Sequence, residues 1–272
     1  MPGAGPGSGR PPRGVLARPL GIERFARLLV ESAAPYAAAI KPNLAFFEAF
    51  GSDGLAVLER IRATLPPDLP VVLDGKRADI GTTVARQAVA LFDRLGADAV
   101  TVNPYLGSEA VAPLLDRQDR FAYILCRTTN PGAGELQSLL VAADPDAGAP
   151  AEPLYVRVAR LASTWGPGAT VGLVAAATAP AELASIRATA PGLPFLIPGI
   201  GAQGGQLEPV LEHGPATAAP GTGRPGKGLL VNVSRAIAAA ASGAPTPGGA
   251  VDLGERLAAA ARDWASRLPV LP

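Results

Sequence analysis

Four charged residues with the types and spacing of an electrostatic catalytic site lie in the first third of the chain: Lys41, Asp74, Lys76 and Asp79. Asp74 and Lys76 end an apolar run, and side chains two apart on a strand point to the same face. Opposite charges held close in a poorly hydrated cavity favour each other's ionised forms. An alternating Lys–Asp–Lys–Asp array is therefore suited to stabilising a negative charge as it develops on a substrate. The alternative is a salt-bridge network on the rim of the fold.

The choice of lysine at two of these positions is informative. The chain has 24 basic residues, but its only lysines are Lys41, Lys76 and Lys227. A lysine ammonium is a compact charge that can donate its proton, whereas an arginine guanidinium keeps its proton. The sequence context favours a chemical role for Lys41 and Lys76, and chance for Lys227.

A glycine-rich stretch, Pro198–Gly205, is a second candidate site feature. Its backbone N–H groups could approach an anion closely, and Gln203 could supply an amide donor. Arg235, at the start of a later helix, could add a bidentate guanidinium. Loops after the last two strands of a β/α barrel often bind phosphate, but a tight turn in a glycine-rich chain is the alternative. Thr128–Gly132 similarly offers groups for binding a polar ring or is an ordinary turn.

These side chains need a scaffold that gathers the ends of strands in one place. Strand-like and helical segments alternate from about Leu20, which predicts parallel βαβ units. A length of 272 residues with 48% hydrophobic residues suits one TIM (β/α)8 barrel. The predicted strands are 36–41, 69–74, 99–102, 121–126, 170–175, 195–197 and 228–231. The predicted helices include 22–34, 44–65, 82–95, 109–117, 154–165, 181–189, 234–241 and 251–268.

The predicted strands fall one short of a closed barrel. The missing strand should precede the helix that begins at Ile22, where the only candidate is the weak Gly14–Ala17. The sequence thus predicts a TIM barrel with its first strand missing or replaced. It also predicts a disordered Gly/Pro-rich segment over residues 1–19 and a single barrel domain over residues 20–272.

Composition excludes several classes of function. A net charge of +1 with interspersed acids and bases argues against nucleic-acid and membrane-surface partners, but leaves room for a small anionic ligand. The single cysteine, Cys126, allows no intramolecular disulfide and is expected to be a buried strand residue. The only histidine, His213, is expected at the surface, and no metal-ligand spacing is evident. Without a signal peptide or an unbroken apolar span, the chain is expected to be cytoplasmic.

Asp74-Gly-Lys-Arg-Ala-Asp-Ile80 resembles the Asp-x-Lys-x-x-Asp-Ile signature of orotidine 5′-phosphate decarboxylases. The resemblance to the longer bacterial subgroup covers about residues 22–267 in the right order. The other segments that carry it are Ile40–Glu48, Asn103–Gly107, Thr129–Gly132, Pro198–Gly205 and Val231–Ile237.

The resemblance implies a cofactor-free conversion of orotidine 5′-phosphate to UMP in pyrimidine biosynthesis. It implies that Lys76 protonates C6, that Asp74 lies beside the substrate carboxylate, and that Lys41 holds the charged network and the ribose. Asp79 and Thr83 would reach across a homodimer interface into the neighbouring site. Thr129 takes the place of a serine that contacts the pyrimidine. The positions for the loop and the phosphate are matched by Pro198, Gln203 and Arg235.

One departure from the family pattern concerns the N-terminus. The family opens with a strand ending in Gly-x-Asp-Pro, and Met1–Pro19 contains no equivalent. A wrong start site, a frameshift or true divergence would each produce this difference. Two alternatives therefore stay open: a catalytically impaired nucleotide-phosphate-binding barrel, and a related metal-dependent sugar-phosphate decarboxylase.

Overall fold

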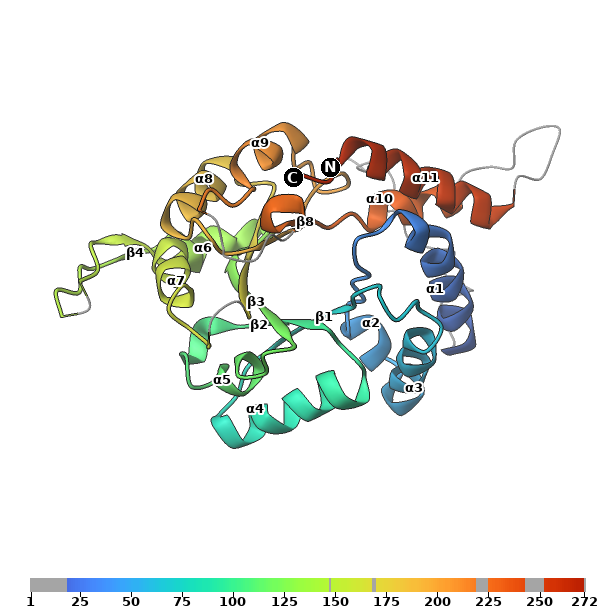
Figure 1. Cartoon of the computed structure of the whole chain (residues 1–272), viewed down its shortest axis with the longest axis horizontal. Helices are drawn as coiled ribbons and strands as arrows, with labels where there is room; N and C mark the ends of the chain where they lie inside the picture. The colour runs from blue at the N-terminus through green and yellow to red at the C-terminus, as the bar shows by residue number, and fades with distance from the viewer. Residues whose placement is uncertain (1–18, 147, 168–169, 219–224, 243–251, 272) are drawn as a thin grey trace, which may run out of the picture. The chain divides into compact units, whose positions relative to one another are not determined.

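The computed structural model describes residues 19–146, 148–167, 170–218, 225–242 and 252–271 (Figure 1). The predicted first-strand candidate, Gly14–Ala17, lies outside the described residues. In the described part, no helix has the length and apolar character needed to cross a bilayer. The chain divides into two compact units. The larger consists of Lys41–Leu44, Pro70–Asn232 and Pro269–Pro272, and the smaller of Met1–Ile40, Ala45–Leu69 and Val233–Leu268.

A six-stranded parallel sheet forms the centre of the larger unit, with strand order β1-β2-β3-β6-β7-β8. Its strands are β1 (Val72–Arg77), β2 (Ala99–Val102), β3 (Phe121–Arg127), β6 (Val171–Ala175), β7 (Phe195–Ile197) and β8 (Leu229–Val231). Every residue of β2, β6 and β7 is buried. Parallel strands that helices cover on both faces are buried on both sides, and their sequences are therefore nearly continuous apolar runs.

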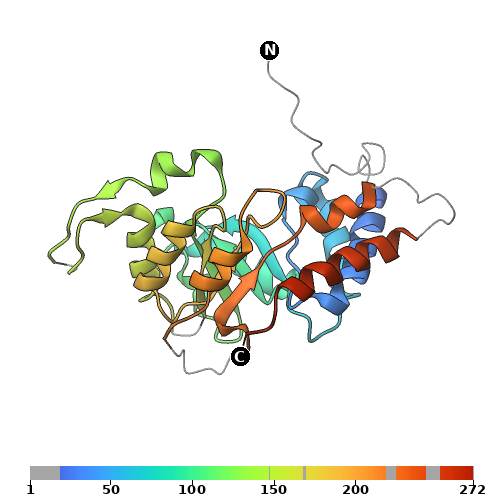
Figure 2. The same cartoon turned by 90° about the horizontal axis from the view of Figure 1, so that it is seen from above.

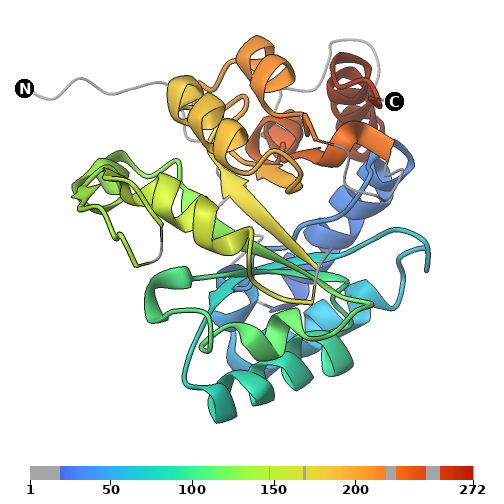
Figure 3. The same ribbon diagram turned by 60° about the vertical axis from the view of Figure 1, so that its left-hand side comes forward.

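Short helices connect the strands of the larger unit and pack outside them (Figure 3). They are α4 (Gly81–Ala88), η2 (Val89–Arg94), η3 (Pro104–Leu106), α5 (Ala112–Leu115), η4 (Pro131–Ala133), α6 (Gly134–Gln137), α7 (Leu154–Ala162), α8 (Pro180–Thr189), α9 (Leu207–His213) and η5 (Pro225–Gly228). Helix α4 packs against α5, and α8 lies between α7 and α9. An antiparallel pair, β4 (Leu140–Val141) and β5 (Glu152–Pro153), carries a hairpin that extends beyond α7 (Figure 2).

Six of the seven predicted strands are confirmed, two with the same ends and four with shifted ends, but the predicted strand 36–41 is wrong. Tyr36 ends the short helix η1 (Ala34–Tyr36), and the pairing with β1 comes later, as one parallel bridge between Asn43 and Asp74. The carbonyl of Pro42 accepts from the backbone N–H of Asp74, and the N–H of Leu44 donates to the carbonyl of Asp74. Because proline has no N–H to donate, the ladder here stays short.

Two predicted helices are also shorter or broken. The predicted helix 44–65 divides into α2 (Ala45–Glu48) and α3 (Gly51–Arg62), since Gly51 has a φ of 60°. A Cβ on Gly54 would lie 1.9 Å from the carbonyl oxygen of Phe47, so the two helices meet through a glycine. The predicted helix 109–117 shrinks to α5, whose first turn contains Pro113. Proline is favoured at the first turn of a helix, where its missing N–H costs nothing.

The secondary-structure elements assigned in the described part of the smaller unit are all helices. They are α1 (Pro19–Ala33), η1, α2, α3, α10 (Arg235–Ala238), η6 (Ala239–Ser242) and α11 (Leu253–Arg267). Helix α1 packs against both α3 and α11. Glu23 on α1 accepts hydrogen bonds from Arg60 on α3 and from Arg27, and the bond from Arg60 does most to lower the pKa of Glu23, to about 2.

Arg187 on α8 is a buried cation that holds two segments of the larger unit together, the loop after α8 and the end of α9. Its guanidinium donates to the carbonyls of Ala190, Leu193 and Gly214 and lies 3.5 Å from the ring centroid of Phe195. Burial lowers the pKa of Arg187 to about 10, so the group remains charged at neutral pH. Lysine lacks the planar fork that reaches several carbonyls at once.

We therefore expect Arg187→Lys to lower the free energy of unfolding by about 2–4 kcal/mol, because buried carbonyls lose their donors. Denaturant unfolding at pH 7 measures the change. Arg86→Lys, on an exposed position of α4, is the matched control and should stay within about 0.5 kcal/mol of the wild type. Equal effects of the two substitutions would contradict the assigned role.

Candidate active site

The end of β1 is irregular, and the irregularity creates the site. Leu73 pairs with Val100 and Arg77 pairs with Val102, so residues 74–76 bulge opposite the single residue Thr101. Lys76 has a φ of 50°, in the left-handed region that is uncommon outside glycine. Such backbone costs on the order of 1–3 kcal/mol and persists where surrounding contacts hold it.

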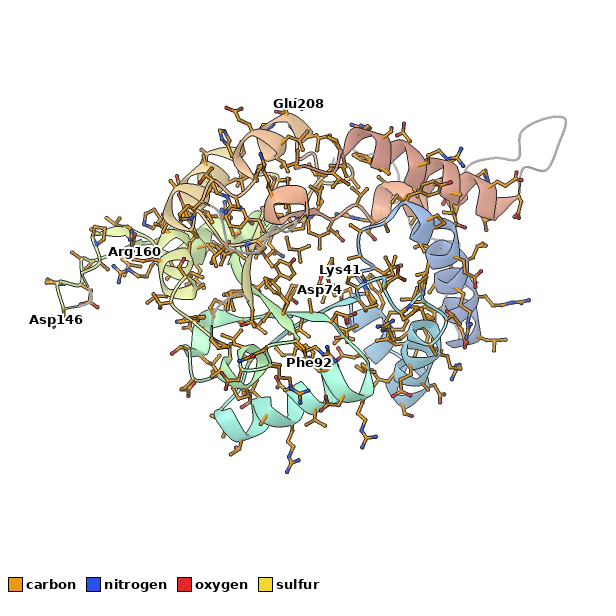
Figure 4. All side chains as sticks on the ribbon, in the orientation of Figure 1. Lys41, Asp74, Phe92, Asp146, Arg160 and Glu208 are labelled. Carbon is orange, nitrogen blue, oxygen red and sulfur yellow. The ribbon has the colours of Figure 1, made fainter. Side chains whose placement is uncertain are left out.

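Asp74 joins the two lysines that the sequence singled out. Its Oδ2 lies 2.6 Å from Nζ of Lys41, and its Oδ1 lies 2.6 Å from Nζ of Lys76. The side chains of Asp74 and Lys41 are only 12% and 14% exposed, whereas that of Lys76 is 46% exposed. Figure 4 shows Lys41 and Asp74 pointing toward one another at this end of β1. Lys76 is therefore the member of the array that is open to a ligand.

The charge of Asp74 is set by two opposing effects. Burial by itself raises the pKa of this carboxyl, but the charge and hydrogen bond of Lys41, together with those of Lys76, outweigh burial. The pKa of Asp74 is consequently held below its usual range. A fixed carboxylate between two ammonium groups is a preorganised electrostatic arrangement, which needs little rearrangement when charge develops on a substrate.

Thr101 is a site residue that the sequence reasoning missed. Its Oγ1 lies 3.0 Å from Oδ1 of Asp74 and 3.0 Å from the backbone N of Lys76. The available signal was a single hydroxyl residue within the otherwise apolar strand Ala99–Val102. The bulge that brings it to Asp74 has no sequence signature that we recognised.

Asp79 and Thr83 lie beyond the array. Oδ1 of Asp79 accepts a hydrogen bond from the backbone N of Ile80 at 2.7 Å, and Thr83 is exposed on the first turn of α4. Neither is a recorded hydrogen-bond partner of Lys41, Asp74 or Lys76 in the described part of the chain. The larger unit thus brings together three of the four predicted catalytic residues.

Two of the predicted binding residues meet across different loops. Nε2 of Gln203 donates to Oγ1 of Thr129 at 2.8 Å. Between them, Gly199 has a φ of 107°, and a Cβ there would lie 2.8 Å from Cγ2 of Thr129. The glycine lets the loop after β7 approach the loop after β3. The carbonyl of Pro198 accepts from Ala177, which fixes the start of the loop.

Arg235 begins α10 and is exposed, in the smaller unit. Its approach to the Gln203 loop stays a prediction. Cys126 is a buried residue of β3, as predicted; burial raises the pKa of its thiol, and its Sγ contacts the carbonyl of Tyr155. Among the described residues, no group of three or more His, Cys, Asp and Glu side chains is placed to hold a metal ion.

These features define an α/β protein with a parallel sheet and a lysine–carboxylate array at the end of one strand. A profile of the Orotidine 5′-phosphate decarboxylase / HUMPS family matches residues 22–246. The chain belongs to that family. Membership places it among enzymes that decarboxylate orotidine 5′-phosphate in pyrimidine biosynthesis.

Individual relatives are similar in sequence or structure to most of this chain. An orotidine 5′-phosphate decarboxylase of Thermomicrobium roseum is 44% identical over 98% of this chain and 86% of its own length. One of Halorubrum lacusprofundi is 48% identical over 78% of this chain and 72% of its own. The structure of Leishmania donovani OMP decarboxylase matches with a TM-score of 0.76 and 36% identity, covering 92% of this chain and 87% of that one.

Proposed function

We propose that this chain converts orotidine 5′-phosphate to UMP with Lys76 as the proton donor to C6 of the pyrimidine. The observation that carries the proposal is the array in which Asp74 holds Lys76 and Lys41 within 2.6 Å. A nearby fixed cation stabilises an unshared electron pair that a reaction leaves on carbon, and an ammonium can also supply a proton.

The proposed steps use only groups of this chain and water. The bond between C6 and the carboxylate breaks, carbon dioxide leaves, and the electron pair stays on C6. The ammonium of Lys76 stabilises this charge and then transfers a proton to C6, after which the neutral amine regains a proton from water. Asp74 holds Lys76 and lies beside the substrate carboxylate, while Lys41 holds Asp74 and the ribose.

The binding roles follow from the loops. We assign the pyrimidine to the hydroxyl of Thr129 and the phosphate to Gln203, Arg235 and the loop that begins at Pro198. The hydrogen bond between Gln203 and Thr129 supports this assignment, because it links the two loops that would hold opposite ends of one nucleotide. Binding energy from the distant phosphate can then orient the ring at Lys76.

Turnover of orotidine 5′-phosphate by the purified chain, with and without a chelator, tests the proposal. We expect the ultraviolet absorbance change of decarboxylation at the same rate in both conditions. Loss of turnover with chelator would indicate the related metal-dependent chemistry instead. Tight binding of UMP without any turnover would indicate a catalytically impaired nucleotide-binding barrel.

We further propose a homodimer in which Asp79 and Thr83 complete the partner's site. Support comes from three large apolar side chains that are exposed just after β1 and β2: Ile80 is 62% exposed, Tyr105 76% and Leu106 49%. Large exposed apolar side chains close in sequence to site residues are consistent with an interface there. We also infer one TIM-barrel domain over residues 20–272 and a cytoplasmic location.

Complementation between two inactive variants tests the shared site. Lys76→Ala and Asp79→Ala chains should each be inactive or nearly so, because each removes one group from both sites of a dimer. After the two are unfolded together at equal concentration and refolded, we expect about a quarter of wild-type activity, since half of the dimers regain one intact site. A mixture with no gain over its components would contradict an Asp79 role across the interface.

A further inference from the structure

The bulge at the end of β1 removes Lys76 from the regular strand ladder. Residues 74–76 face Thr101 alone, because pairing resumes only at Arg77 and Val102. A backbone N–H in a bulge lacks its ladder acceptor and must find another partner. For the N–H of Lys76, that partner is Oγ1 of Thr101 at 3.0 Å.

The directions of the two hydrogen bonds to Thr101 are fixed by chemistry. A backbone N–H can only donate, so the hydroxyl oxygen accepts from Lys76. An ionised carboxylate can only accept, so the single hydroxyl proton goes to Oδ1 of Asp74. One side chain therefore holds the backbone of the proton donor and the carboxylate that binds its ammonium.

We propose that Thr101 is a positioning residue that sets Lys76 relative to Asp74 for catalysis. The inference rests on the proposed function of Lys76. Thr101 is 2% exposed within the wholly buried strand β2, so water cannot replace its hydroxyl without opening the core. Its β-branched shape also packs well in a central strand.

A role in packing alone makes different demands on this position. Packing requires the volume of threonine, which valine preserves. Positioning requires the hydroxyl, which serine preserves. Valine and serine at position 101 therefore separate the two roles, since each keeps what the other removes.

Steady-state kinetics of Thr101→Val and Thr101→Ser with orotidine 5′-phosphate test the proposal. We expect Thr101→Val to lower kcat by about 10- to 100-fold with KM within about threefold, because one of the lost hydrogen bonds holds the backbone of Lys76 and the other holds Asp74, which binds the Lys76 ammonium. Thr101→Ser should keep kcat within about threefold while its melting temperature falls.

Thr170→Val is the matched control. Thr170 is also 2% exposed, and its hydroxyl donates to the carbonyl of Leu115 at 3.0 Å, outside the array. It should lose stability without a comparable loss of kcat. A Thr101→Val chain with wild-type kcat, or a Thr101→Ser chain as impaired as Thr101→Val, would overturn the positioning role.

A wild-type chain without turnover would overturn the proposed function, and a crystal structure of Thr101→Val then decides the positioning role separately. We expect Nζ of Lys76 to have left Oδ1 of Asp74 in that structure. An unchanged contact between Lys76 and Asp74 would overturn the inference independently of any activity.

Discussion

Replacing Lys76 by alanine is expected to lower kcat by roughly four to six orders of magnitude, while the affinity for UMP stays within about tenfold of the wild type. The loss is large because one ammonium both stabilises the developing charge and supplies the proton. UMP carries no carboxylate at C6, so its binding depends less on this group. Single-turnover kinetics and titration with UMP measure the two quantities.

Lys227→Ala is a closely matched control for this substitution. Lys76 and Lys227 are the only residues other than glycine with positive φ in the described part of the chain, at 50° and 45°. The two substitutions thus remove the same charge from backbone of the same kind. Of these two lysines, Lys76 is the one that contacts Asp74, so a kcat loss shared equally by both variants would refute the assignment of the proton donor.

Replacing Asp74 by asparagine is expected to lower kcat by about two to four orders of magnitude and to change how stability depends on pH. The amide cannot bind two ammonium groups as the carboxylate does, so Lys41 and Lys76 lose their common anchor. In the folded wild type the pKa of Asp74 lies below its unfolded value of about 4. Ionised Asp74 therefore stabilises the fold above about pH 4, and this contribution is lost as the pH falls through the folded pKa.

Denaturant unfolding across this range gives the test: the difference in unfolding free energy between wild type and Asp74→Asn should shrink on acidification. Asp93→Asn supplies the comparison, because Asp93 also has a lowered pKa, caused first by its hydrogen bond to Arg117, but is exposed and outside the array. Its kcat should match the wild type. A difference that stays constant with pH for Asp74→Asn would contradict the ionisation assigned to it.

Much of the site could be predicted from the sequence because the ends of buried strands have a recognisable pattern. A buried apolar run followed by charged residues located Asp74 and Lys76, and the rarity of lysine marked Lys41. The glycine-rich stretch indicated Gln203 and the family resemblance indicated Thr129, and the structure joins the two by a hydrogen bond. Local pattern sufficed for these residues because they follow directly after strands or lie in recognisable loops.

The sequence did not predict features that depend on tertiary pairing. Alternation along a strand explained why Asp74 and Lys76 share a face, but the structure brings them together through a bulge with left-handed backbone at Lys76. The proposed role of Thr101 depends on that bulge, so the sequence pattern alone did not predict it. The pairing with β1 lies at Asn43, beyond the predicted strand 36–41, and Pro42 beside it has no N–H to extend the ladder. The effect of this proline depends on which strand lies next to it, and the sequence pattern did not show that.

The pairing of one carboxylate with two ammonium groups also has a consequence for the order of events in turnover. In the proposed mechanism, the three groups that one chain supplies, Lys41, Asp74 and Lys76, carry one surplus positive charge before the partner's Asp79 is counted. A bound substrate carboxylate cancels the surplus, and the carbanion left by carbon dioxide cancels it equally. Proton transfer then removes the charges of Lys76 and C6 at once, so the three groups and the reacting carbon stay balanced through the chemistry. The surplus returns only when Lys76 takes up a proton from water. The three groups are then charged for the carboxylate of the next substrate, whereas the product has no carboxylate at C6 to balance them.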